Sequence, residues 1–212
     1  MTKLTRIWFV YVPLVCAAVP LVCLPLSQRA AVAPHGHMFF VWFSFLCVLP
    51  TVVAIPLFFV ALIGLCFRRV RFISMVSALC SGVYLIAYIL SPKIGDEIRM
   101  NAFHRLAERS KSLVDAVRAY EEKHGRPPDS LEALVPEFIP SVPTTEMGAY
   151  PKYKYSVVTN TNYSGNHWII TIFTPSAGIN FDQFMYWPLT NYPARGYGGW
   201  IERVGDWAYV HE

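Results

Sequence analysis

The first 95 residues contain no aspartate and no glutamate. All 14 acidic residues of the 212-residue chain lie from Asp96 onward, together with 11 of its 18 basic residues. The second part therefore has a formal net charge of −3, and the overall charge of +4 comes from lysines and arginines of the first part. Because nucleic-acid binding requires a basic stripe on a folded domain, we expect no nucleic-acid partner.

Cysteine is also absent after residue 80. The five cysteines are Cys16, Cys23, Cys47, Cys66 and Cys80. No disulfide is therefore available to the second part, which must rely on its hydrophobic core, and about 110 residues are enough for one. The sequence has no CxxC pattern and no Cys/His spacing typical of a metal site. His35 and His37 alone provide too few ligands, so we predict no metal and no cofactor.

Long apolar runs dominate the first part, at Ile7–Leu26, Met38–Phe67 and Phe72–Leu90. A helix needs about 20 mostly apolar residues to cross a bilayer, so the runs predict three transmembrane helices in residues 1–95. Prolines occur inside the first two runs. They predict kinks, because neighbouring helices can satisfy the carbonyl groups that proline leaves free.

Basic residues near the ends of these runs predict the orientation. They gather before the first run and between the second and third, as Lys3, Arg6, Arg68, Arg69 and Arg71, whereas the first loop has only Arg29. Lysine and arginine favour the cytoplasmic side. Three spans then place residues 96–212 outside the cytoplasm, and we expect a multi-pass protein of a bacterial inner membrane with a periplasmic domain. A cleaved signal peptide is the alternative for the first run, and it would leave the later orientation unchanged.

Residues 96–124 have the pattern of an amphipathic helix. Apolar residues recur at three- and four-residue steps, at Phe103, Leu106, Leu113, Val117 and Tyr120, with Ser110 keeping the register. Gly125 predicts a left-handed end to this helix, and Pro127 and Pro128 prevent its continuation. A second, short helix is expected next, capped by Asp129 or Ser130, with Leu131, Leu134 and Val135 facing inward.

After Pro143 the pattern changes to alternation and aromatic residues. The segments "YKYSVVT" and "HWIITIFT" predict two strands joined by a hairpin loop, and "FMYWP", "WIERV" and "WAYVHE" suggest two or three more. The predicted fold class is thus a membrane α-helical anchor in residues 1–95 plus an α+β domain in residues 96–212, with the long amphipathic helix packed on a small antiparallel sheet.

The stretch "YEEKHGRPPDSLEALVPEFIPSVP", preceded by a helix and followed by strands, resembles the soluble domain of type II secretion pseudopilins. Tyr120, Gly125, Arg126, Pro127, Ser130, Leu131, Leu134, Pro136 and Pro143 stand at places comparable to that family's motifs. The resemblance covers residues 100–160 and implies the fold and an extracytoplasmic compartment. The chain departs from the family at its start, where it has three apolar runs, no prepilin-peptidase site and no early glutamate, so the resemblance does not imply assembly into a pilus.

No pattern of catalytic residues is present. The histidines of the second part, His104, His124, His167 and His211, have no partners at the spacing of a known catalytic motif. We therefore predict that the protein is not an enzyme, that it has no catalytic residues, and that a small-molecule substrate is not expected.

Fifteen aromatic residues lie from Tyr150 onward. Core packing and a belt at the membrane surface are the simplest interpretation. The sharper one is a partner-binding surface formed by Tyr192, Tyr197 and Trp200 around the loop "YPARGYGGW". From these observations we expect an accessory or scaffold protein in a membrane or secretion-type assembly, with membrane lipid and other membrane or periplasmic proteins as partners. The alternative is a membrane-anchored module that binds cell-wall glycan.

Overall fold

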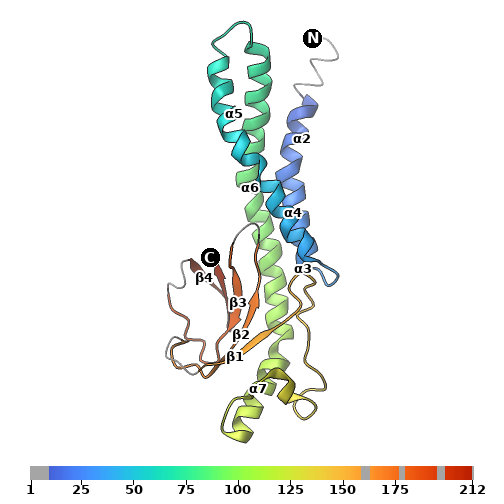
Figure 1. Ribbon diagram of the computed structural model, residues 1–212, viewed down its shortest axis with the longest axis vertical. Coiled ribbons are helices and arrows are strands. Elements are labelled where there is room, and N and C mark those ends of the chain that lie inside the picture. Colours follow the sequence, from blue (N-terminus) through green and yellow to red (C-terminus); the bar gives the residue numbers. More distant parts are fainter. Residues whose placement is uncertain (1–9, 159–162, 177–179, 195–198, 212) are drawn as a thin grey trace. The chain divides into compact units, whose positions relative to one another are not determined.

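The chain folds into two compact units, seen here in a computed structural model that describes residues 10–158, 163–176, 180–194 and 199–211 (Figure 1). The first unit comprises Met1–Ala30 and Phe39–Ile98, and the second comprises Ala31–Met38 and Arg99–Glu212. Helix α6 (Arg71–Arg109) contributes residues to both. It continues without a break through Pro92 and Gly95, whereas the sequence pattern did not indicate whether the helix is continuous there.

The first unit consists of helices. In order these are α2 (Val12–Ala18), the π-helix η2 (Val19–Cys23), α3 (Leu24–Val32), α4 (Met38–Val48), α5 (Pro50–Gly64) and the first part of α6. Joined end to end, they give three helical stretches in the described chain that are long and apolar enough to cross a membrane. These stretches are Val12–Val32, Met38–Gly64 and Arg71–His124, of 21, 27 and 54 residues. The prediction of three long apolar helices is confirmed.

α5 continues through Pro56, whereas Pro50 lies where one helix ends and the next begins. α4 stops at Val48 and α5 starts at Pro50, and the Tyr84 hydroxyl donates to the nearby Cys47 carbonyl at 3.0 Å. In the π-helical segment, the Ser91 hydroxyl donates to the Pro20 carbonyl at 2.6 Å. Carbonyl groups close to the prolines thus find hydroxyl donors on α6, which removes the cost of an unsatisfied group in apolar surroundings.

The first apolar helix is longer at its end than the predicted Ile7–Leu26. It continues through Ser27 and Gln28 to Val32. The Ser27 and Ser44 hydroxyl oxygens are 2.5 Å apart, and Gln28 Nε2 donates to Ser44 at 3.3 Å. These buried polar groups satisfy one another, so the helix does not have to stop where the apolar run stops.

The amphipathic stripe predicted for residues 96–124 is buried except at Tyr120, which is half-buried. Phe103, Leu106, Leu113 and Val117 are each 0% exposed. Ser110, which lies between α6 and α7 (Lys111–His124), is buried with them and donates to the Leu106 carbonyl at 2.7 Å. Gly125 ends α7 with a left-handed φ of 67°, so that prediction is confirmed.

The predicted short helix is a 3₁₀ turn, η3 (Leu131–Leu134). Leu131 and Leu134 are buried as expected, but the prediction that Val135 also faces inward is wrong, because its side chain is 37% exposed. The backbone at Val135 is already extended (φ −94°, ψ 137°), so the residue no longer follows the helical stripe. Ser130 is the N-cap residue of η3, but its side chain makes no capping hydrogen bond, so the predicted cap is wrong in this respect. Asp129 instead accepts a hydrogen bond from Arg126 at 2.9 Å.

Five strands form one antiparallel sheet in the order β1-β2-β3-β5-β4. Their bounds are β1 (Lys154–Val157), β2 (Trp168–Phe173), β3 (Gln183–Tyr186), β4 (Trp200–Val204) and β5 (Trp207–His211). β1, β2, β4 and β5 fall within segments predicted as strands, and β3 begins one residue before the segment "FMYWP". β1 and β4 are the edge strands.

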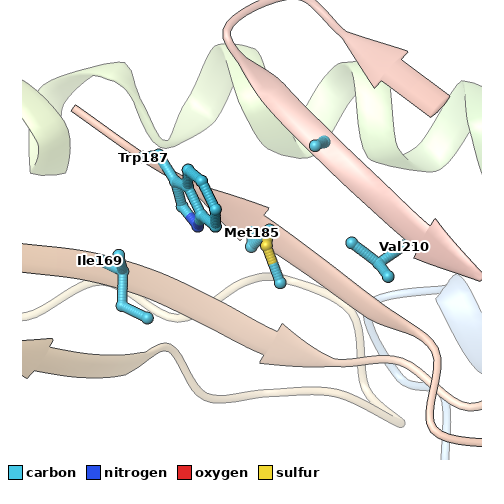
Figure 2. Close-up of a cluster of buried hydrophobic side chains, with 5 residues drawn as sticks. Ile169, Met185, Trp187 and Val210 are labelled. Carbon is cyan, nitrogen blue, oxygen red and sulfur yellow. The ribbon is translucent and has the colours of Figure 1, made fainter. Parts of the chain in front are cut away.

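One face of the sheet packs on the helices. Phe184 stacks on Phe103 with ring centres 4.7 Å apart, and the Trp168 indole donates to Glu121 at 3.0 Å. Side chains alternate along a strand, so the neighbours of these residues point to the other face. There Ile169, Met185, Trp187, Ala208 and Val210 form a second buried cluster (Figure 2). Part of this second face is therefore apolar as well, and Val158, Tyr163, Tyr192 and Ile201 pack against the second cluster.

The second unit also includes the loop Ala31–Met38, which holds His35 and His37. The Gly148 amide donates to the Ala33 carbonyl at 2.8 Å, and the Ala149 amide donates to the Ala31 carbonyl at 3.1 Å. Gly148 lies directly against the Gly36 backbone, and a β-carbon at Gly148 would overlap it. A glycine at this position is what permits the close approach.

Candidate functional site

A buried arginine lies between α6 and the sheet. Arg99 is 2% exposed. Its guanidinium donates to the Tyr209 hydroxyl at 2.9 Å, to the Thr174 carbonyl at 2.7 Å and to the Tyr150 hydroxyl at 3.2 Å. The rings of Phe103, Tyr150 and Tyr209 lie 5.3 to 5.9 Å from its central carbon. The charge is thus held by hydrogen bonds and aromatic faces, as a buried cation requires.

The two tyrosine hydroxyl groups that accept from Arg99 in turn donate hydrogen bonds to the chain between β2 and β3. Tyr209 donates to the Asp182 carboxylate at 2.6 Å, and Tyr150 donates to the Pro175 carbonyl at 2.6 Å. Asp182 also accepts from Asn180 at 2.9 Å. Burial raises the pKa of both tyrosines, so both keep their protons at neutral pH. We call Arg99, Tyr150, Asp182 and Tyr209 the Arg99 network, and it joins α6 to β5 and to the start of β3.

The opposite face of the sheet carries an open groove of about 740 Å³. It runs over β1, β2 and β3, and its lining includes Lys152, Lys154, Ser156, Thr171, Phe173 and Gln183. We call it the β1–β3 groove. Its volume is within the usual range for a ligand site, and its floor has hydroxyl and amide groups beside an aromatic ring that is 49% exposed, that of Phe173.

The charge of the groove has one sign. Within the described part of the chain, the charged residues that line it are Lys152 and Lys154. This local excess of positive charge lies in a unit whose net charge is negative. The groove is therefore suited to an anionic group, which the two ammonium groups attract and the hydroxyl groups can hydrogen-bond. Among the residues the structure describes, no group of three or more potential metal ligands comes together.

The groove opens beside β1, which has no partner strand on its outer side among the residues that the structure describes. The Val158 amide donates to the His167 carbonyl at 2.8 Å, which sets the hydrogen-bonding phase of β1 against β2. In an antiparallel pair the backbone groups of alternate residues point to opposite sides. Tyr155 and Val157 therefore direct their N–H and C=O groups away from β2, and the Val157 side chain is 42% exposed.

The three residues predicted to bind a partner differ in their surroundings. Tyr192 is part of the fold, because its hydroxyl accepts from the Trp187 amide at 2.8 Å and donates to the Asp206 carbonyl at 2.9 Å. Its ring stacks on Trp187 and lies under Arg203. Trp200 is 65% exposed at the start of the edge strand β4 and stacks on His211. Tyr197 lies outside the described residues.

Sequence reasoning missed both the Arg99 network and the groove. Arg99 has the appearance of one more charged residue on a polar helix face. The signal for the groove was present in the alternation "KYKYS", which places Lys152, Lys154 and Ser156 on one side of an extended chain. That the same side faces Thr171 and Gln183 follows only from the strand pairing.

Comparisons with known proteins add no relative. A scan against protein-family models finds no match, and neither do searches of the curated proteins and of the solved structures. The resemblance to the soluble domain of pseudopilins therefore stays a prediction.

Proposed function

We propose that this protein is an integral membrane protein that presents its second unit outside the cytoplasm as a module for binding other proteins. In a bacterial cell this is an inner-membrane protein with a periplasmic domain, acting as an accessory or scaffold subunit of a membrane or secretion-type assembly. The proposal has two parts, the anchor and the binding module, and each rests on a different observation.

The anchor is supported by the apolar side chains that the long helices leave uncovered. In α5 alone, Val52 is 71% exposed, and Val60 and Ile63 are each 64% exposed. A water-soluble protein rarely exposes continuous apolar surface of this kind, whereas a bilayer solvates it at no cost. This observation carries the proposal.

The orientation follows from Arg68, Arg69 and Arg71, which lie between α5 and α6. A cluster of arginines beside a span favours the cytoplasmic side. The third span then leads the chain to the other side, where the second unit folds. Membrane lipid is accordingly one partner of the protein.

The binding module is supported by the β1–β3 groove. The groove is open, lies on the face of the sheet away from α6, and carries two lysines over a polar floor. The described residues bring together no metal cluster, and in the buried Arg99 network the guanidinium and the Tyr209 hydroxyl hydrogen-bond to groups of the fold. Binding therefore accounts for the second unit better than catalysis does.

Reporter fusions test the orientation. Alkaline phosphatase, which is active only outside the cytoplasm, is fused after Glu212 or, in a truncated chain, after Arg69. We expect activity from the first fusion and none from the second. Green fluorescent protein at the same two positions is the reciprocal control. An active phosphatase after Arg69, or a fluorescent fusion after Glu212, contradicts the proposal.

Site-specific photocrosslinking in intact cells tests the binding module. A photoreactive phenylalanine replaces Thr171 in the groove or Glu122 on the exposed side of α7. We expect a crosslinked protein from the first position that is absent from the second. Identical products from both positions would mean that the groove has no special role.

A cell-wall glycan is the second candidate ligand of the same unit. The hydroxyl groups of Ser156 and Thr171, the amide of Gln183 and the exposed ring of Phe173 are groups that also suit a sugar. Sedimentation of the purified protein with insoluble peptidoglycan distinguishes the two. Retention on peptidoglycan that disappears in a Phe173→Ala variant would favour the glycan.

A further inference from the structure

The free edge of β1 and the β1–β3 groove together have the features of a site for one kind of ligand. From this geometry we propose that the second unit binds an extended acidic peptide of a partner protein, which adds to β1 as a sixth strand and directs its carboxylates to Lys152 and Lys154. The inference rests on the proposed function, because it names the part of the partner that the binding module recognises.

The backbone of β1 supplies the first half of the recognition. Tyr155 and Val157 point their N–H and C=O groups outward, two residues apart, along an exposed edge. An extended peptide presents donors and acceptors at the same spacing, and strand addition to a sheet edge is a common mode of peptide recognition. A glycan has no such repeating pair of groups, which is why we favour a peptide.

The side chains of β1 supply the second half. Lys154 pairs with Thr171 and Ser156 pairs with Ile169, and all four line the groove. A residue of the added strand that faces Lys154 on this side would have its β-carbon about 5 Å from that of the lysine. A glutamate or aspartate there forms an opposite-charge cross-strand pair, and an acidic residue two positions away reaches Lys152.

The residue between the two carboxylates points to the other face of the sheet, where it lies beside Tyr155 and the 42% exposed Val157. An apolar residue fits this position. The preferred ligand is therefore an extended segment with the order acidic, apolar, acidic.

Lys154 also explains how the edge avoids wrong partners. A lysine on an edge strand is a common means of preventing edges from pairing, because an apolar strand cannot neutralise its charge. The same charge attracts a strand that carries carboxylates. The site thus selects by charge as well as by backbone pairing.

The test measures the binding of a fluorescein-labelled ten-residue peptide with a Glu-Val-Glu centre to the full-length protein in non-ionic detergent, by fluorescence anisotropy. Three peptides are compared: the parent, a Lys-Val-Lys version, and the parent N-methylated at the residues whose N–H groups would face β1. We expect binding of the parent alone, with at least tenfold weaker binding of the other two. Equal binding of the parent and its N-methylated form would overturn strand addition, since methylation leaves the charges intact.

Variants of the protein test the same edge by changing β1 and leaving the peptide unchanged. Val157→Pro removes an outward N–H and no ladder hydrogen bond, and an edge strand tolerates this change. We expect it to weaken binding of the parent peptide at least tenfold. Lys154→Glu keeps the backbone and should weaken binding about fivefold to tenfold. Lys111→Glu, which makes the same charge change on α7, should leave affinity within about twofold.

The remaining outcomes decide against the proposal. The first is no binding of the parent peptide at 1 mM, and the second is unchanged affinity of the Lys154→Glu variant. The third is that soluble peptidoglycan fragments bind, that Lys154→Glu abolishes this binding, and that the peptide does not bind. Because the assay uses detergent-solubilised protein, its result does not depend on membrane orientation. Failure of the peptide therefore overturns this inference alone, whereas the reporter fusions test the anchor.

Discussion

Replacing Arg99 with methionine removes the charge at the centre of the Arg99 network while keeping a long side chain in a helix. Arg99 donates to Tyr150, Thr174 and Tyr209, and the Tyr209 hydroxyl links it to the Asp182 carboxylate. Without the guanidinium, the Thr174 carbonyl loses a donor, and the buried carboxylate loses the positive charge that compensates it.

The size of the effect follows from the cost of breaking a buried polar network on one side. Removing one partner of a buried charge pair typically costs about 3–5 kcal/mol. The methionine side chain recovers part of the lost stability by packing against the Phe103 ring, which lies 5.3 Å from the central carbon of the Arg99 guanidinium. We therefore expect Arg99→Met to lower the free energy of opening of the second unit by about 3 kcal/mol.

Hydrogen exchange of the full-length protein in detergent is the suitable assay. A chain with a membrane anchor does not unfold in a two-state manner, so a single melting temperature is not defined. Amide exchange in β2, β3 and β5 reports the opening of the sheet alone. Arg105→Met, at an exposed position on the same helix, is the matched control and should change the opening free energy by no more than about 0.5 kcal/mol.

The double variant Arg99→Met/Asp182→Asn completes the test. Because it removes both charges, its loss should be smaller than the sum of the two single losses by about 1–3 kcal/mol. If Arg99→Met behaves like Arg105→Met, or if the two losses simply add, then the network does not hold α6 to the sheet in the way described.

Three further predictions concern the second unit. Gly148→Ala should increase amide exchange of the loop at Gly36, because the added β-carbon overlaps the loop backbone; normal protection would contradict this. Tyr192→Phe should destabilise the sheet by about 1–3 kcal/mol, since its hydroxyl hydrogen-bonds to backbone groups; unchanged hydrogen exchange would mean that this hydroxyl does not stabilise the sheet. Burial raises the pKa of Tyr150, Tyr192 and Tyr209, so the unfolded chain loses these protons first and stability should fall as pH rises above about 10, by at most about 1.4 kcal/mol per tyrosine at pH 11. Equal opening free energies at pH 9 and pH 11 would be inconsistent with that prediction.

The elements of the fold could be predicted from the sequence because their signals are local. Twenty-residue apolar runs, a three- and four-residue apolar step ending at Gly125, and alternating strands each depend on neighbours along the chain. The failures were local as well. Val135 leaves the helical stripe because the 3₁₀ turn ends one residue earlier, and the first helix passes Leu26 because its polar residues find a partner in Ser44.

The sites could not be predicted in the same way because their residues are far apart in the chain. Arg99 meets Thr174 and Tyr209, 75 and 110 residues away, and nothing near Arg99 distinguishes it from the solvated arginines of the same helix. Tyr192 and Trp200 look alike as loop aromatics, yet one hydroxyl is bonded into the fold and the other ring is exposed.

The sequence by itself determined the division into an apolar and an acidic part, the number of long apolar helices and the segments that form strands, because composition and periodicity act over a few turns of chain. Only the tertiary structure decided which arginine is buried, which edge of the sheet is free, and which lysines share a groove. Those properties depend on strand order and register, which bring distant residues together through contacts that no single segment encodes.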